Sequence, residues 1–123
     1  MLGASAAAAL LLFLGSAAAA PGDLDPTFGT NGVAEATQGL GTVMALQPDG
    51  KILVAGYTFP WELSVVRYAP DGRLDRSFGS GGVAVGPSGR ALGLAIQPDG
   101  KIVAAGGNKN RRSMFAVARY LAT

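Results

Sequence analysis

One stretch of eight residues occurs twice in the chain, with its copies 50 residues apart, and it restricts the folds open to this sequence. The copies are Ala-Leu-Gln-Pro-Asp-Gly-Lys-Ile at 45–52 and Ala-Ile-Gln-Pro-Asp-Gly-Lys-Ile at 95–102. Each places a polar turn between two apolar runs, a pattern typical of β-hairpins. Proline presets φ, aspartate bonds its own backbone, and glycine accepts a left-handed conformation. The sequence therefore predicts a duplicated β unit, with turns at Pro48, Asp49 and Gly50 and at Pro98, Asp99 and Gly100.

The similarity between the two copies extends beyond the turns. The pattern Gly-x-Leu-Asp-x-x-Phe-Gly-x-x-Gly-Val-Ala stands at 22–34 and at 72–84, and each unit contains an Arg-Tyr pair. A fixed period of this kind indicates a repeat architecture. We expect the recurrent residues to have structural roles in turns and in packing. They are Leu24, Asp25, Phe28, Arg67 and Tyr68, and then Leu74, Asp75, Phe78, Arg119 and Tyr120.

The hydrophobic pattern predicts an all-β fold. No segment has sustained helical periodicity, and short apolar runs alternate with turns rich in glycine. The runs that follow Lys51 and Lys101 are apolar, which predicts strands covered on both faces. We expect four short strands in each unit of about 50 residues. Strands are expected near 42–47, 51–56 and 63–68, with counterparts near 92–97, 101–106 and 115–120.

The phase of the repeat is unusual. The second unit stops at the Arg-Tyr pair, and a copy of the segment that follows Tyr68 in the first unit stands at the N-terminus. In a propeller, such a cut allows an N-terminal strand to complete the last blade and latch the ring. The alternative is a longer array truncated by chance.

The N-terminal segment predicts export. Residues 4–20 are rich in alanine and leucine, with small residues toward Ala20, as in a cleaved secretory signal. The apolar core is too short for a membrane span of about 20 residues. We therefore expect a signal helix at 1–20, a first repeat unit at 21–71 with a latch strand at 22–34, and a second unit at 72–123. The predicted location is secreted or extracytoplasmic; a retained anchor or a misassigned start is the alternative.

Composition excludes several kinds of chemistry. The chain has no cysteine and no histidine, which rules out disulfides, thiol catalysis, a lipoprotein anchor and the usual zinc ligands. A net charge of +2 gives no argument for nucleic acid.

The repeat motif resembles the delta-60 repeat family. The resemblance rests on Ala-x-Gln-Pro-Asp-Gly-Lys-Ile-x-x-Ala-Gly, then Arg-Tyr, then Asp-Gly-x-Leu-Asp-x-x-Phe-Gly, and covers 22–120. It implies two tandem four-stranded antiparallel β-propeller-like blades of an exported bacterial protein, and it carries over no catalytic residue or cofactor. Propellers have typically 4–8 blades, so two units do not close a ring. The expected partners are other blades, through self-association of three or four chains or a longer array.

Most charged residues that recur have a structural explanation. The Asp-Gly pairs are explained as turns, and an aspartate before a loop more often caps backbone amides than binds metal. Asp23 and Asp25 suggest a calcium site only superficially, because the counterpart of Asp23 is Arg73. We expect no metal site, and we expect Arg67 and Arg119 to pack on an aromatic face or to pair with Asp25 or Asp75.

The residues that differ between the units are the candidates for a binding site. The loop at 57–62 is aromatic, whereas its counterpart at 107–113 is basic and polar. Aromatic side chains stack on sugars or bury in partners, and a basic loop attracts anions. The candidate binding rim for a protein or glycan consists of Phe59, Trp61, Lys109, Arg111 and Arg112. The alternative is ordinary loop divergence, with Trp61 packed on a neighbouring blade.

These observations favour a non-catalytic exported repeat module that acts as a scaffold or an interaction surface. A fragment of a larger propeller without independent function is one alternative. A hydrolase or lyase that depends on carboxylates or a metal is another, although only Glu35 and Glu62 lie outside the repeat pattern.

Overall fold

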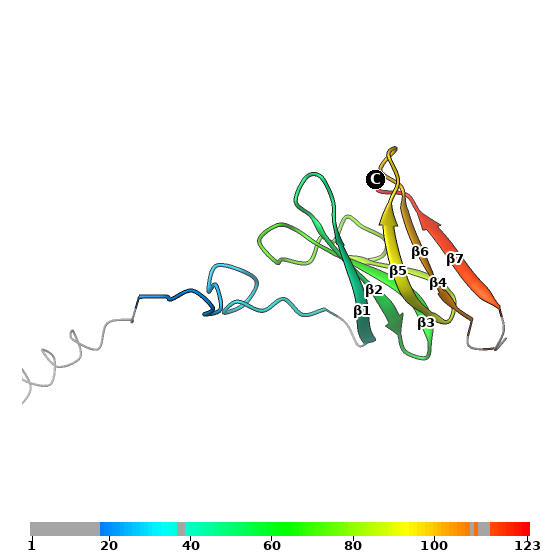
Figure 1. Cartoon of the computed structure of the whole chain (residues 1–123), viewed down its shortest axis with the longest axis horizontal. Helices are drawn as coiled ribbons and strands as arrows, with labels where there is room; N and C mark the ends of the chain where they lie inside the picture. The colour runs from blue at the N-terminus through cyan, green and yellow to red at the C-terminus, as the bar shows by residue number, and fades with distance from the viewer. Residues whose placement is uncertain (1–17, 37–38, 109, 111–113) are drawn as a thin grey trace, which may run out of the picture.

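Seven β-strands in two antiparallel sheets make up the core of this computed structural model, which describes residues 18–36, 39–108, 110 and 114–123. The sheets lie side by side in Figure 1. The first sheet has the order β1-β2-β3-β4 and the second has the order β5-β6-β7. The strands are β1 (Gly39–Leu46), β2 (Ile52–Thr58), β3 (Glu62–Tyr68), β4 (Val83–Ser88), β5 (Arg90–Ile96), β6 (Ile102–Gly107) and β7 (Phe115–Tyr120).

The duplicated Pro-Asp-Gly stretch forms the β1–β2 and β5–β6 hairpin turns. In the first turn the Gln47 amide donates to the Lys51 carbonyl at 2.8 Å, and the equivalent distance in the second turn is also 2.8 Å. The Asp49 carboxylate accepts from the Lys51 amide at 3.1 Å. Asp99 does the same in the second turn at 3.1 Å. Each aspartate therefore accepts a hydrogen bond from the backbone two residues later, and this local bond stabilises the turn.

The first strand of each sheet has a β-bulge where it pairs with the second strand. The register of β1 on β2 shifts between Gly41 and Val43, and that of β5 on β6 shifts between Ala91 and Gly93. A β-bulge of this kind brings two backbones close together. A Cβ added at Gly56 would collide with the Leu40 carbonyl oxygen. Glycine therefore recurs after alanine in β2 and β6 because a larger residue would not fit beside the neighbouring strand.

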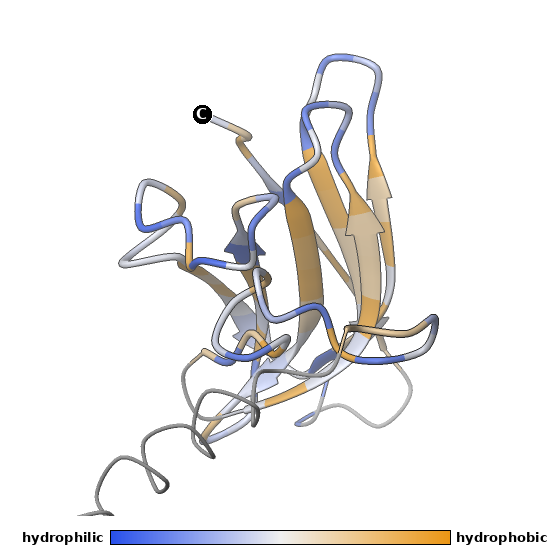
Figure 2. Ribbon diagram, turned by 90° about the vertical axis from the view of Figure 1, so that its left-hand side faces the viewer, coloured by the Kyte–Doolittle hydropathy of each residue, from blue (hydrophilic) through white to orange (hydrophobic). Residues whose placement is uncertain are grey.

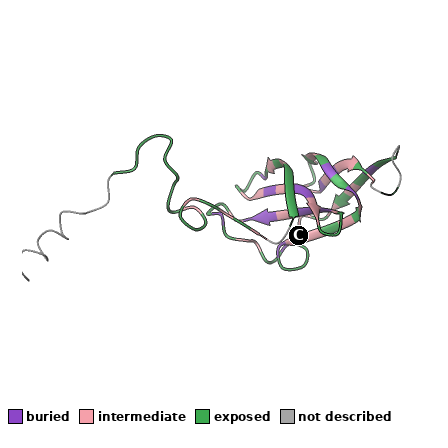
Figure 3. Cartoon of the chain, turned by 90° about the horizontal axis from the view of Figure 1, so that it is seen from below, coloured by how far each residue is buried: buried purple, intermediate pink, exposed green. Residues whose placement is uncertain are grey.

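The core lies between the two sheets. Leu53, Ala55, Leu63 and Val65 of the first sheet form one buried cluster with Ala91, Ile102 and Ala104 of the second sheet and with Phe78. Strand β5 contacts β1, β2 and β3, and β7 contacts β4. Figure 3 shows buried residues concentrated where the sheets meet, and Figure 2 shows apolar residues along the strands and polar residues in the turns. Because side chains alternate along a strand, β2 is fully buried on only one face, with Ile52 and Val54 half-buried on the other.

The all-β prediction is confirmed, and the first sheet has the four strands expected of a unit. Among the described residues, the second sheet has three. The predicted unit boundary at 71/72 falls between β3 and β4 of the first sheet. The predicted latch at 22–34 contains only an isolated bridge between Thr30 and Val33, and in Figure 1 it lies on the side of β1, away from β7.

Most of the predicted signal helix lies outside the described residues. Within the part of the chain that the structure describes, no helix is both long and apolar enough to cross a membrane.

Candidate interaction surface

A buried ion pair anchors the segment that completes the first sheet. The Nε of Arg67 on β3 lies 2.8 Å from an Asp75 carboxylate oxygen, with the two side chains 4 % and 13 % exposed. The guanidinium also lies over the Phe78 ring at 4.5 Å from its centroid. Backbone bonds reinforce the contact, since the Asp75 amide donates to the Arg67 carbonyl at 2.9 Å. This pair holds the loop that leads into β4.

Asp75 is stabilised in its charged form. The Ser77 hydroxyl donates to one carboxylate oxygen at 2.5 Å and the Ser77 amide donates to the same oxygen at 3.1 Å. These bonds, followed by the charge of Arg67, lower the pKa of Asp75 from 3.8 to about 2 against the opposing effect of burial. Lys51 adds a second cation at 3.5 Å. The carboxylate is therefore ionised throughout the physiological range.

The N-terminal hook is defined here as residues 25–36, and its turn at 25–33 repeats the backbone of the docked segment at 75–83. The Phe28 amide donates to the Asp25 carbonyl at 3.1 Å, and the equivalent bond 50 residues later measures 3.2 Å. The Gly32 amide donates to the Phe28 carbonyl at 2.9 Å, against 2.8 Å in the docked copy. The Thr27 hydroxyl donates to the Asp25 carboxylate at 2.6 Å and lowers its pKa, as Ser77 does for Asp75. The hook thus has the docked conformation without the arginine partner.

The residues of β3 beside the docked segment also have counterparts, on β7. Arg119, Phe115 and Val117 are the counterparts of Arg67, Leu63 and Val65 on β3. Val65 is 0 % exposed and Val117 is 66 % exposed, while Leu63 is 0 % and Phe115 is 95 %. Phe115 and Val117 line an open hollow of about 660 Å³ on the outer face of the second sheet. Equivalent positions of the repeat are therefore covered in one sheet and exposed in the other.

Arg119 is exposed and takes part in none of the ion pairs found among the described residues. The pKa of Asp99 is lowered mainly by its hydrogen bonds from Lys101, and the charge of Arg119 contributes only a smaller effect. Arg119 thus has the position of Arg67 without a described carboxylate at ion-pair distance.

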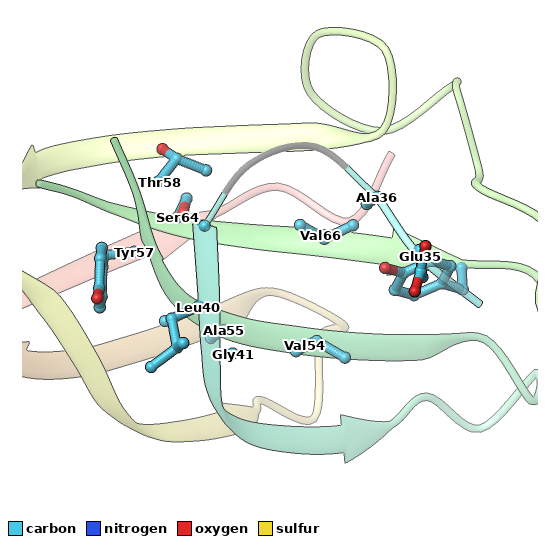
Figure 4. Close-up of a pocket in the computed structure, with 13 residues that line it drawn as sticks. Glu35, Ala36, Leu40, Gly41, Val54, Ala55, Tyr57, Thr58, Ser64 and Val66 are labelled. Atoms are coloured by element: carbon cyan, nitrogen blue, oxygen red, sulfur yellow. The ribbon is translucent and has the colours of Figure 1, made fainter. Parts of the chain in front are cut away.

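The outer face of the first sheet carries a second hollow, of about 310 Å³, beneath the hook. Figure 4 shows Glu35 and Ala36 at one end of it, with Leu40 and Tyr57 at the other. Tyr68 also lines it. Burial, and then the nearby charge of Glu35, raise the pKa of Tyr68 above 10.0. The counterparts of this face on the second sheet, Ala118 and Tyr120, pack against the core between the sheets.

The aromatic half of the predicted binding rim forms a cluster at one end of the first sheet. Tyr57 stacks on Trp61 with ring centroids 4.3 Å apart, and meets Phe59 edge to face at 5.9 Å. Trp61 lies at φ 116° and lines a hollow with Asn108, which begins the opposite loop. Trp61 thus lies beside the start of the opposite loop, whereas the basic half of the predicted rim, Lys109, Arg111 and Arg112, lies outside the described residues.

The remaining acidic residues are engaged locally. Asp23 accepts from the Ala20 amide at 2.7 Å, so it does not join Asp25 in a common site. Within the described residues, no group of three or more acidic, histidine or cysteine side chains has the arrangement of a metal site.

Sequence reasoning did not identify which residues form the two outer faces, nor the position of Glu35. The repeat alignment pairs Val117 with Val65, but a pattern of residue types does not say which copy is covered. Glu35 lies outside the repeat pattern, and an isolated glutamate gives no signal of its own.

One family model matches the chain, at residues 47–78 and 97–123, and its description is a β-propeller domain of unknown function (DUF5122). No curated protein and no solved structure matched the chain. The two matched segments begin at equivalent positions of the two repeats, at Gln47 and Gln97. Together with the two antiparallel sheets, the match supports a β-propeller repeat family for this chain.

Proposed function

We propose that the protein is a non-catalytic, exported β-propeller repeat module that acts as a scaffold by stacking its blades on those of other copies. The first and second sheets are its two blades. The observation that carries this proposal is the contrast between Val65, fully buried between the sheets, and its counterpart Val117, 66 % exposed. An apolar patch of this kind on a small protein marks an interaction surface.

The two outer faces are suited to each other. Within one chain, the face of the first sheet that carries Leu63 and Val65 packs on the face of the second sheet that carries Ile102 and Ala104. The outer face of the second sheet carries the counterparts of Leu63 and Val65. The outer face of the first sheet carries the counterparts of Ile102 and Ala104. A head-to-tail contact between copies would therefore reproduce an interface that already exists inside the chain.

The recurrent charged residues support a non-catalytic role. Asp49 and Asp99 bond their own turns, and Asp75 is paired with Arg67. Each of these carboxylates has a structural use that explains its recurrence, and general acid–base chemistry needs a group within reach of a substrate.

The molar mass in solution tests the scaffold proposal. Protein expressed from the complete 123-residue sequence should elute as a species of three or four chains, measured by light scattering during size exclusion. Val117→Asp places a charge on the outer face and should shift the mass to one chain. Phe59→Asp, a matched change at an exposed loop residue, should leave the mass unchanged. A wild-type monomer at all concentrations would refute stacking.

The rim is a second candidate site, favoured by the hollow that Trp61 shares with Asn108. We infer that it binds sugars, since stacked aromatic rings offer flat apolar surface next to polar groups. Trp61 is the only tryptophan of the chain, so its fluorescence reports on this site alone. Titration with neutral polysaccharide fragments should change that fluorescence saturably, and a flat response across neutral and acidic fragments would exclude the sugar site.

A further inference from the structure

We propose that the N-terminal hook of one copy completes the second sheet of another copy, pairing with the edge of β7 that no described strand occupies, so that Asp25 meets Arg119. This inference rests on the proposed stacking and names the segments that would carry it. The hook has the conformation of a segment that is already docked elsewhere in the same chain, and β7 is the counterpart of the strand on which that segment docks.

The internal junction supplies the template. The loop before β4 is held on β3 through the Arg67–Asp75 pair, and the Arg67 amide donates to the Gly82 carbonyl at 3.1 Å. Strand β4 then pairs with β3, with Val65 opposite Ala84. Moving each residue by the repeat offset places Val117 opposite Ala34 and Arg119 beside Asp25. Residue types are conserved between the copies at all four positions.

The hook already has the position that this pairing requires. In the internal junction, Arg67 also donates to the Ala122 carbonyl at 2.6 Å, and Phe78 and Gly79 line a hollow with the C-terminal residues 121–123 of the second sheet. The hook makes the equivalent contact with the first sheet, because the Gly29 amide donates to the Asp71 carbonyl at 2.7 Å. It therefore lies against the face on which a preceding sheet would stack.

Geometry favours a second copy as the occupant. The hook lies on the side of β1 in Figure 1, whereas β7 lies at the opposite side of the two sheets. A hook docked on the β7 of another chain would remain against its own first sheet, and that sheet would cover Phe115 and Val117 of the other chain. This single contact would pair the edge of β7, give Arg119 a carboxylate partner and cover the outer face of each sheet.

Introduced cysteines test the pairing directly, because the chain has none of its own. Residues directly opposite in an antiparallel pair lie within the Cα separation that a disulfide needs. The double variant A34C/V117C, oxidised and run on a non-reducing gel, should form covalent multimers. The matched control V33C/V117C should not, because a shift of one residue turns the side chain to the other face.

The outcomes separate this inference from the scaffold proposal. No bridging in a protein that light scattering shows to contain several chains would overturn the docking of the hook and leave stacking intact. A bridge within one chain would overturn the assignment to a second copy. A monomeric wild type with no bridging would overturn both proposals.

A charge exchange gives an independent readout of the same contact. Asp25→Arg and Arg119→Asp should each raise the dissociation constant of the assembly at least about tenfold, and the double variant should restore most of the loss. Asp23→Arg changes the same charge two residues away and should have no effect. Equal effects of Asp23→Arg and Asp25→Arg, or no rescue in the double variant, would overturn the proposed pair.

Discussion

The Arg67–Asp75 pair gives a prediction that can be worked from the structure. Lowering the pKa of Asp75 from 3.8 to about 2 corresponds to about 2 kcal/mol of stability at neutral pH. Asp75→Asn removes this contribution and leaves a guanidinium that is only 4 % exposed without its counter-ion. Removing one partner of a buried pair costs about 3–5 kcal/mol. Because the Phe78 ring and the Ala122 carbonyl still contact the guanidinium, we expect a loss at the lower end, about 3 kcal/mol.

The pH dependence has a definite sign. Asp75 has a lower pKa in the folded state than in the unfolded state, so its contribution is present above pH 3.8 and is lost as the pH falls toward 2. Urea unfolding followed by Trp61 fluorescence, at one protein concentration, should therefore show the wild type approaching Asp75→Asn in stability between pH 4 and pH 2. The variant itself should change less over this interval.

A matched control separates this pair from ordinary surface charge. Asp71 lies 3.5 Å from Arg73, whose side chain is 85 % exposed. Exposed pairs contribute about 0–1 kcal/mol, so Asp71→Asn should lower the free energy of unfolding by less than about 0.5 kcal/mol. A loss this small for Asp75→Asn at pH 7, or a difference from the wild type that does not shrink in acid, would refute the reasoning.

Three further predictions concern other parts of the chain. Gly106→Ala puts a Cβ against the Arg90 carbonyl oxygen at the β-bulge, and should lower the unfolding free energy by at least about 2 kcal/mol in urea titrations; an unchanged midpoint would contradict the bulge geometry. Glu35→Gln should lower the pKa of Tyr68, read from the absorbance of its phenolate, because the nearby negative charge is removed; no shift would mean that the hook does not lie over the first sheet in solution. Trp61→Ala should cost about 1 kcal/mol in thermal melts through loss of aromatic stacking, without altering the assembly mass.

The features that could be predicted from sequence are those decided within a few residues. The turn at Asp49 follows from its own backbone bond, and the Arg67–Asp75 pair was among the alternatives that the repeat suggested. The register shift at Gly41 and Val43 was not predicted, although a glycine recurring inside a strand is a known signal of close backbone approach. Whether Val117 is covered was not predictable, because coverage depends on what packs against the sheet and not on the residue.

The local structure of the hook affects the entropy that is lost when two copies assemble. Docking a flexible segment requires that its residues be ordered on binding, at about 1–2 kcal/mol for each residue whose backbone is fixed. The turn between Asp25 and Val33 already has the hydrogen bonds of its docked counterpart, so much of this cost is met within the undocked chain. The same local rigidity would make each junction between copies repeat the geometry of the junction inside the chain. Equal junctions turn the chain by the same angle at every step, so they either close into a ring of definite size or continue as a filament. A single sharp mass in solution therefore requires that the angle between the two sheets of one chain divide a full turn into an even number of blades.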